Sequence, residues 1–278
     1  MDIREAVTKQ RLFFDGGMGT ELYKRGFEGD TALANLNAPD AVTEIHRAYI
    51  QAGANILTAN TFGAYKHKHD NSAEIIKAAL DIAKKAREGQ SVYIAMDLGS
   101  TGMMLEPYGD VSIEECREVF SEAAKAGAEN GADLILIETI MDINELEAAV
   151  EAAAETGLPI MATMSFTESG RTMYGASIPD MADALNHPNV IAIGMNCGFG
   201  PKAYMPLIES LLENTDKPII LQPNAGLPVV NSEGVPEYDL SPEDFAKLMT
   251  AAAEKGARLL GGCCGTSPAH IAAMVNAL

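Results

Sequence analysis

The chain has 278 residues, of which 47% are hydrophobic and 21% charged, so it holds enough apolar material for a large core and is not predominantly disordered. Asp and Glu number 39 against 20 Lys and Arg, and the formal charge of −19 disfavours nucleic acid and anionic membrane surfaces as partners. No apolar run approaches the roughly 20 residues that span a bilayer, and the first residues lack the pattern of a signal peptide. We therefore expect a cytoplasmic protein with neither a nucleic-acid nor a membrane partner.

Eight short apolar runs follow one another along the chain, separated by segments with a helical pattern. The runs that predict strands lie at residues 12–14, 56–62, 92–98, 134–138, 159–165, 190–196, 219–222 and 258–261. The other segments place apolar residues at a 3.6-residue spacing, which predicts helices at residues 40–53, 71–89, 112–131, 142–157, 179–185, 203–214, 242–256 and 268–278. The chain therefore alternates strand and helix from beginning to end.

Capping signals mark several of the helix starts. Ser112 followed by Glu115 has the form of a capping box. Ser241 and Ser267 each precede a proline, as expected for an N-cap followed by proline in the first helical turn. These boundaries agree with the ones that the apolar periodicity predicts.

Eight strand–helix units in one chain predict an α/β fold of the (β/α)8 TIM-barrel type, whose usual size is about 250 residues. Several of the strands are almost purely apolar, as parallel strands buried on both faces are. The alternative is an open, doubly wound sheet, but no glycine-rich dinucleotide-binding motif follows the first strand. No linker or change of composition divides the chain, so we predict a single domain over residues 1–278.

In a TIM barrel the functional side chains gather at the carboxyl ends of the strands. Polar residues and cysteines follow the predicted strands in the order Asp15-Gly16-Gly17, Asn60-Thr61, Glu138-Thr139, Asn196-Cys197, Asn224 and Cys263-Cys264. We expect these residues, which are far apart in the sequence, to meet on one rim of the barrel.

Three cysteines on this rim predict a metal site. Glycines on both sides of Cys263 and Cys264 allow the sharp bend that brings two neighbouring thiols to one point, and Cys197 can complete the set. Three thiolates suit Zn²⁺ and leave its fourth position open to a substrate. The alternative is that the cysteines are small buried apolar residues, a description that fits Cys116 in the predicted helix at residues 112–131.

Two acidic residues and a glycine-rich turn predict a pocket for a free amino acid. Asp15 and Glu138 can hold an ammonium group through charge-assisted hydrogen bonds. The backbone amides near Gly16 and Gly17 can bind a small anion such as a carboxylate. The alternative is that Asp15 caps a helix and Glu138 pairs with an arginine.

These motifs together resemble those of the homocysteine S-methyltransferase family, whose domain is also found at the N-terminus of cobalamin-dependent methionine synthase. The resemblance covers essentially the whole chain and rests on Asp15-Gly16-Gly17-Met18-Gly19-Thr20, Asn60-Thr61-Phe62, Glu138-Thr139, Gly194-Met195-Asn196-Cys197, Pro223-Asn224-Ala225-Gly226 and Gly261-Gly262-Cys263-Cys264-Gly265-Thr266. The Asn-Cys and Gly-Gly-Cys-Cys-Gly segments are the most specific of these.

The resemblance implies that Cys197, Cys263 and Cys264 bind Zn²⁺, which activates the thiol of L-homocysteine. It assigns the substrate's amino group to Asp15 and Glu138, and its carboxylate to the amides near Gly16 and Gly17. It adds Thr61 and Asn224 to the substrate-binding set, and Asn224 matches a position that can approach the metal when substrate is absent. The implied reaction is an attack of the zinc-activated thiolate on an activated methyl group, which yields methionine.

The motifs do not identify the methyl donor. We favour methylcobalamin or another methylcorrinoid carried by a separate corrinoid protein, because the segments at residues 102–110 and 169–172 look more like the methionine synthase branch. The chain stops after the eighth strand–helix unit, so we do not expect it to bind a corrinoid alone. The alternatives are a self-contained methyltransferase that uses S-methylmethionine or a similar sulfonium donor, a different small thiol as acceptor, and a subunit that binds homocysteine or another thiol without turnover.

Overall fold

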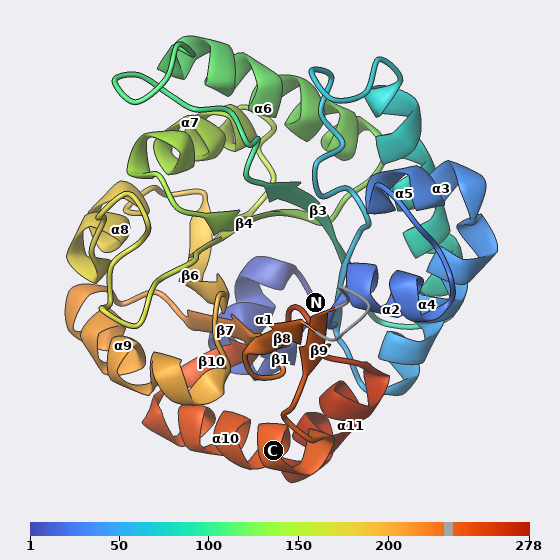
Figure 1. Ribbon diagram of the computed structural model, residues 1–278, viewed down its shortest axis with the longest axis vertical. Helices are drawn as coiled ribbons and strands as arrows, with labels where there is room; N and C mark the ends of the chain where they lie inside the picture. The colour runs from blue at the N-terminus through green and yellow to red at the C-terminus, as the bar shows by residue number, and fades with distance from the viewer. Residues whose placement is uncertain (231–235) are drawn as a thin grey trace.

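Eight parallel strands form the central sheet of the computed structural model, which describes residues 1–230 and 236–278 (Figure 1). They are β1 (Leu12–Phe13), β2 (Ile56–Thr58), β3 (Tyr93–Gly99), β4 (Leu134–Ile140), β5 (Ile160–Met164), β6 (Val190–Cys197), β7 (Ile219–Pro223) and β10 (Ala257–Leu260). Their order in the sheet is β1-β10-β7-β6-β5-β4-β3-β2. A parallel bridge between Phe14 and Ile56 joins the two ends of that order, so the strands close into a barrel.

A ring of helices covers the outside of the barrel (Figure 1). It consists of α4 (Pro39–Gln51), α5 (Ser72–Ala86), α6 (Ile113–Glu129), α7 (Ile143–Ala154), α8 (Ile178–Ala184), α9 (Pro201–Asn214), α10 (Pro242–Lys255) and α11 (Pro268–Ala277). The predicted TIM barrel is thus confirmed. The capping box of Ser112 with Glu115 is present at the start of α6, and Ser241 caps α10 with proline in the first turn. No helix in the described ranges is long and apolar enough to cross a membrane.

Several short elements have no counterpart in the predicted pattern. They are α1 (Ile3–Lys9), α2 (Met18–Lys24), the 3-10 helix η1 (Thr31–Leu33), α3 (Ala34–Asn37), and an antiparallel pair formed by β8 (Pro228–Val230) and β9 (Pro236–Tyr238). The strand predicted over residues 56–62 is also too long, because the chain turns sharply after Thr58, where the Thr61 amide donates to the Ala59 carbonyl at 2.7 Å. These elements are too short for apolar periodicity to reveal.

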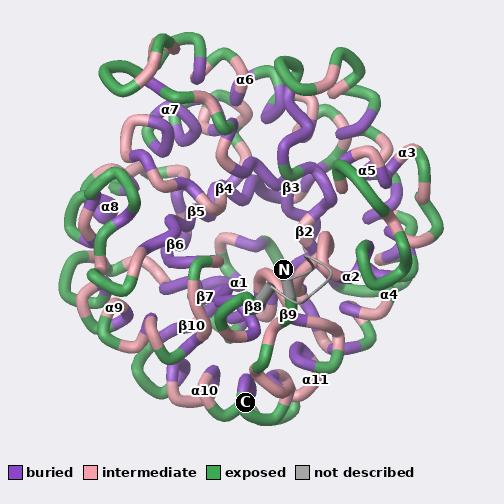
Figure 2. Tube along the Cα trace, viewed as in Figure 1, coloured by how far each residue is buried: buried purple, intermediate pink, exposed green. Residues whose placement is uncertain are grey.

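The apolar core has two parts, one inside the barrel and one between the strands and the outer helices. Ile3, Ala6 and Val7 of α1 belong to the same buried cluster as Leu12 and Phe14, so α1 covers the amino-terminal end of the barrel interior. Figure 2 shows the buried strands at the centre and the exposed outer surfaces of the helices around them. With its amino-terminal end filled by apolar side chains, the barrel has room for a ligand at the opposite end.

A glycine in β6 permits the close approach of β7. A Cβ atom at Gly194 would lie 1.9 Å from the carbonyl oxygen of Ile220. We expect Gly194→Ala to lower the free energy of unfolding by about 3 kcal/mol or more, because the overlap is with backbone and cannot be relieved by a rotamer change. Urea denaturation measures this loss. Gly19→Ala in α2 is the matched control, since its Cβ has 3.5 Å of space, and an equal loss in both variants would contradict the prediction.

Candidate active site

A cavity of about 360 Å³ opens at the carboxyl ends of the strands. Among the metal- and substrate-binding residues predicted from the sequence, it is lined by Asp15, Gly16, Gly17, Glu138, Cys197, Cys263 and Cys264. Thr61 and Asn224 do not line it. The cavity therefore brings together side chains from the carboxyl ends of β1, β4, β6 and β10.

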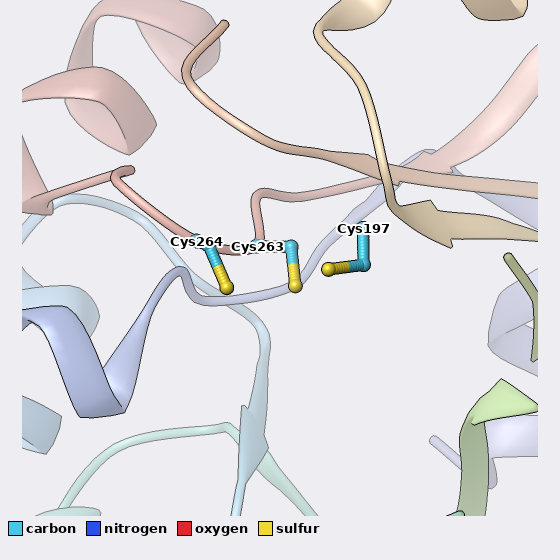
Figure 3. A group of neighbouring side chains, drawn as sticks. All are labelled: Cys197, Cys263 and Cys264. Carbon is cyan, nitrogen blue, oxygen red and sulfur yellow. The ribbon is translucent and has the colours of Figure 1, made fainter. Parts of the chain in front are cut away.

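The three cysteines that line this cavity lie next to one another (Figure 3). Cys197 is the last residue of β6, whereas Cys263 and Cys264 follow β10. Their Sγ atoms all lie within 4.8 Å of one another, and within the described residues they are the only such group of three or more metal-ligating side chains. Figure 3 shows the side chains of Cys263 and Cys264 pointing the same way and that of Cys197 pointing toward Cys263.

Local backbone geometry explains how neighbouring thiols reach one point. Cys197 has a positive φ of 58°, which turns the chain away from the strand direction at the end of β6. The amide of Cys263 donates to the Pro223 carbonyl at 2.8 Å, and the amide of Cys264 donates to Asn224 Oδ1 at 3.1 Å. Both cysteines are thereby anchored to the end of β7. Gly265 follows at a φ of 80°, a conformation that glycine adopts without strain.

The thiols interact strongly with one another. The pKa of Cys264 is lowered because the side chains of Cys197 and Cys263 hydrogen-bond to its sulfur, and Tyr238 adds a further hydrogen bond; burial opposes this shift. The pKa of Cys263 is raised, chiefly by its hydrogen bonds with the other two cysteines and by burial. The cluster therefore favours a thiolate at Cys264, which is the form that binds metal ions.

The contact of Tyr238 with Cys264 has a measurable consequence. Tyr238 is the last residue of β9, and its ring lies against Gly265, where a Cβ would meet it at 2.2 Å. We expect Tyr238→Phe to weaken zinc binding by about 10-fold, because the variant loses a hydrogen bond that stabilises the Cys264 thiolate. Competition with a chromophoric chelator measures the zinc affinity. Tyr108→Phe, a change at an exposed ring in the loop after β3, is the control, and the same affinity in both variants would count against this role.

Asp15 lines the same cavity and is 3% exposed. The amide of Thr58 donates to its Oδ2 at 2.9 Å and the Thr58 hydroxyl donates to its Oδ1 at 2.8 Å. Burial raises the pKa of Asp15 to about 7, against the effect of these hydrogen bonds. The alternative role as a helix cap is wrong, since α2 starts at the N-cap Gly17 and has no side-chain cap.

Glu138 extends from β4 into the same cavity. Its pKa is raised to about 8, first by burial and then by the negative charges of Asp15 and Cys264. The alternative in which Glu138 pairs with an arginine is also wrong, because no ion pair among the described residues includes Glu138. Beside it, Thr139 has a φ of 60° and exchanges two hydrogen bonds with the side chain of Asn196, at 2.9 and 2.8 Å. That exchange ties the end of β4 to the residue before Cys197.

Two buried polar residues within strands line the cavity but are missing from the sequence-based set. Asp97 in β3 and Gln222 in β7 are each 3% exposed and line the cavity. They lie within the predicted strands, whereas the predicted site residues lie at the strand ends or just beyond them. The signal that could have identified them is a polar residue inside an otherwise apolar run. Burying such a residue is costly, and the packing of a strand does not require it.

Thr61 and Asn224 lie behind the cavity wall. The Thr61 hydroxyl donates to the Asp97 carbonyl at 2.9 Å and accepts from the Asp97 amide at 3.0 Å. Asn224 uses its Oδ1 to hold the Cys264 amide. The amide of Gly17 likewise already donates to the Thr266 hydroxyl, at 3.1 Å. These contacts position the cavity residues, and a direct contact of Thr61, Asn224 or the Gly17 amide with substrate stays a prediction.

Comparison with protein families gives one match along nearly the whole chain. A profile described as homocysteine S-methyltransferase matches residues 12–278. The methionine synthase of Mycobacterium tuberculosis (strain ATCC 25618 / H37Rv) is 31% identical over 296 aligned residues, which cover 97% of this chain and 25% of that protein. The methionine synthase of Mycobacterium leprae (strain TN) is 30% identical, with 97% and 24% covered. The chain thus spans about a quarter of the length of these two relatives.

Solved structures of the homocysteine methyltransferase MmuM from Escherichia coli share the fold of this chain over nearly the full length of both proteins. The apo form has a TM-score of 0.81 at 26% identity, with 100% of both chains covered. The metallated form has a TM-score of 0.84 at 25% identity, with 99% of both chains covered. The similarity therefore extends to a protein that has been crystallised both without and with metal.

Proposed function

The chain belongs to the homocysteine S-methyltransferase family, and from this membership we propose that it transfers a methyl group to the thiol of L-homocysteine, forming methionine. The observation that carries the proposal is that one cavity is lined both by the cysteine cluster and by the carboxyl groups of Asp15 and Glu138. Homocysteine has a thiol at one end and an ammonium group at the other. The cysteines and the carboxyl groups that line the cavity match those two groups.

The cysteine set fits a zinc ion. In a tetrahedral site with Zn–S bonds of about 2.3 Å, the sulfur atoms are about 3.8 Å apart, and the three Sγ atoms here lie within 4.8 Å of one another. Cys197, Cys263 and Cys264 would hold the ion and leave one position for the substrate sulfur. A bound zinc ion would lower the pKa of the substrate thiol, so that the sulfur is a thiolate at neutral pH.

The acidic residues orient the amino acid. An ammonium group near Glu138 and Asp15 would favour the ionised forms of these carboxyls, whose pKa values are raised by burial to about 8 and about 7. In the transfer step, a bond forms between the homocysteine sulfur and the methyl carbon. The bond from that carbon to the donor breaks, and its electron pair leaves with the donor. Because the thiol proton has already been lost, no side chain needs to accept a proton in this step.

The surface around the cavity supports a protein-bound methylcorrinoid as the donor. Most of the large apolar side chains that are exposed in the described residues lie on segments that follow strand carboxyl ends: Tyr23, Phe62, Met104, Tyr108, Met173, Tyr174, Leu227 and Val229. The rings of Tyr108 and Tyr174, from the loops after β3 and β5, lie 6.0 Å apart. Exposed apolar surface of this kind is typical of an interaction site, and a corrinoid protein docked there would present its methyl group to the cavity.

The charge of the cavity supports a second donor class. The described residues that line it include three carboxylates and three cysteines but no Lys, Arg or His. A cationic sulfonium such as S-methylmethionine is attracted to such a site, whereas an anionic donor is repelled. The protein would then need no donor protein.

The two donors are distinguished by offering each one separately. Zinc-loaded protein is incubated with L-homocysteine and either methylcobalamin or S-methylmethionine, and methionine is measured. Product with methylcobalamin alone supports the corrinoid donor, and product with S-methylmethionine alone supports the sulfonium donor. Tight binding of zinc and homocysteine without product from either would favour a subunit that binds the thiol without turnover.

A further inference from the structure

Two residues that line the cavity have a backbone conformation that side chains rarely adopt. Thr139, near the end of β4, has a φ of 60°, and Cys197, at the end of β6, has a φ of 58°. Within the described ranges they are the only non-glycine residues with a positive φ. Such conformations cost energy, above all for a β-branched residue such as threonine, and they persist only where surrounding contacts hold them.

The side chain of Asn196 connects these two positions. Asn196 directly precedes Cys197 and is 0% exposed. Its Oδ1 accepts hydrogen bonds from the amide of Thr139 at 2.9 Å and from the hydroxyl of Thr163 at 2.8 Å, and its Nδ2 donates to the hydroxyl of Thr139 at 2.8 Å. One amide group therefore ties the carboxyl ends of β4, β5 and β6 together.

The backbone at Asn196 and Cys197 is held as well. The hydroxyl of Ser165, which follows β5, donates to the Asn196 carbonyl at 2.8 Å. The hydroxyl of Tyr204 in α9 donates to the Cys197 carbonyl at 2.5 Å. Because the Asn196 side chain and both carbonyls are fixed in this way, the Cys197 side chain points toward Cys263, as Figure 3 shows.

We propose that Asn196 is a positioning residue for the cysteine cluster: its amide holds the left-handed backbone that directs the Cys197 thiol toward Cys263 and Cys264. The inference rests on the proposed function, since it requires the three thiols to bind one ion, and it extends that function to a residue that does not line the cavity. In metal sites, the contacts that orient a ligand matter nearly as much as the ligand, and their loss typically weakens metal binding by about 10- to 100-fold.

The network needs an asparagine because it contains both kinds of partner. The Thr139 amide and the Thr163 hydroxyl require an acceptor, while the oxygen of the Thr139 hydroxyl receives an N–H. A carboxamide supplies a carbonyl and an NH₂ on one group. An alanine would leave the buried Thr139 amide unpaired, and the backbone at Thr139 and Cys197 would lose the contacts that hold it in a costly conformation.

The test measures metal binding rather than methyl transfer. The variants are Asn196→Ala, which removes the amide, and Thr163→Val, which keeps the side-chain shape and removes one hydrogen bond to that amide. The matched controls are Asn189→Ala, just before β6 at its opposite end, and Thr43→Val, at a buried hydroxyl in α4. Chelator competition gives the zinc affinity, and urea denaturation of the metal-free protein gives the stability. With saturating Co²⁺ in place of zinc, the thiolate-to-metal absorption per bound ion reports the number of thiolate ligands.

We expect Asn196→Ala to weaken zinc binding by about 10- to 100-fold and Thr163→Val by about 3- to 10-fold. Asn196→Ala should also lose about a third of the thiolate-to-cobalt absorption, because one of three thiolates is no longer directed at the ion. Both controls should keep the wild-type absorption and a zinc affinity within about 2-fold of the wild type. A purely structural role of Asn196 would lower the stability of the variant and leave the absorption per bound ion unchanged.

An unchanged cobalt absorption in Asn196→Ala would therefore overturn the positioning role, and zinc binding and methionine formation by the wild type would still support the proposed function in that case. If Asn196→Ala does not fold, Thr163→Val carries the test, and an unchanged zinc affinity in that variant overturns the inference. If the wild-type protein itself binds no zinc, the proposed function is contradicted, and the inference with it.

Discussion

Cys197→Ala is expected to lower the zinc affinity by about 100-fold or more and to reduce zinc-dependent methyl transfer to the background level. The variant removes one of three ligands that come from two different segments, and Cys263 and Cys264 alone cannot complete the set. Without the ion, the homocysteine thiol keeps its usual pKa near 8.5 and is mostly protonated at neutral pH. Chelator competition measures zinc binding, and methionine formation measures the transfer.

The matched control is Cys116→Ala. Cys116 is fully buried in α6 and does not belong to the cysteine cluster, so its loss removes a thiol without removing a ligand. We expect this variant to bind zinc and transfer methyl groups as the wild type does. If Cys197→Ala retained the zinc affinity and the rate of the control, the assignment of Cys197 as a ligand would be wrong.

Glu138→Gln is expected to stabilise the ligand-free protein at pH 8 and to weaken its binding of L-homocysteine by about 10- to 100-fold. The pKa of Glu138 is raised from 4.5 to about 8 in the folded protein, so the unfolded chain loses this proton at a lower pH than the folded chain does. Between these two pH values the unfolded state binds fewer protons, and the stability of the wild type therefore falls as the pH rises. Glutamine does not ionise and avoids that loss.

The stability gain should be absent below pH 4.5, grow as the pH rises, and reach on the order of 4 kcal/mol near pH 8. Urea denaturation at pH 4.5 and pH 8 measures it, and calorimetry with homocysteine measures the loss of binding. Glu129→Gln at an exposed position in α6 is the control and should change neither quantity. A variant that is less stable than the wild type at pH 8 would contradict the raised pKa, and unchanged homocysteine binding would contradict the assigned role.

The two effects of Glu138→Gln have one cause. Asp15, Asp97 and Glu138 repel one another in a buried cavity that holds no basic side chain among the described residues, and a ligand with an ammonium group removes that repulsion. The protein thus carries unfavourable electrostatic energy that binding can release. Under the proposed function, the residue expected to bind the substrate's amino group is also one that destabilises the free protein.

The barrel was predictable because its signals are local and repeated. Runs such as residues 134–138 are apolar throughout, which is typical of parallel strands buried on both faces, and Ser112 with Glu115 marks a helix start by its chemistry alone. The short helix α1 was missed because its three buried residues, Ile3, Ala6 and Val7, are too few to set a period. Its role in covering the barrel interior depends on residues far away in the chain.

By itself, the sequence determined the fold class and the identity of the most distinctive residues, since glycines beside Cys263 and Cys264 and a strand end at Cys197 are visible without coordinates. Only the tertiary structure decided which polar side chains face the cavity. It placed Asp97 and Gln222 in the cavity, put Thr61 and Asn224 behind its wall, and brought Tyr238 to Cys264. The reason is that a strand's pattern shows which residues are apolar, whereas the direction and pairing of a polar side chain depend on the neighbouring strands that meet it across the closed barrel.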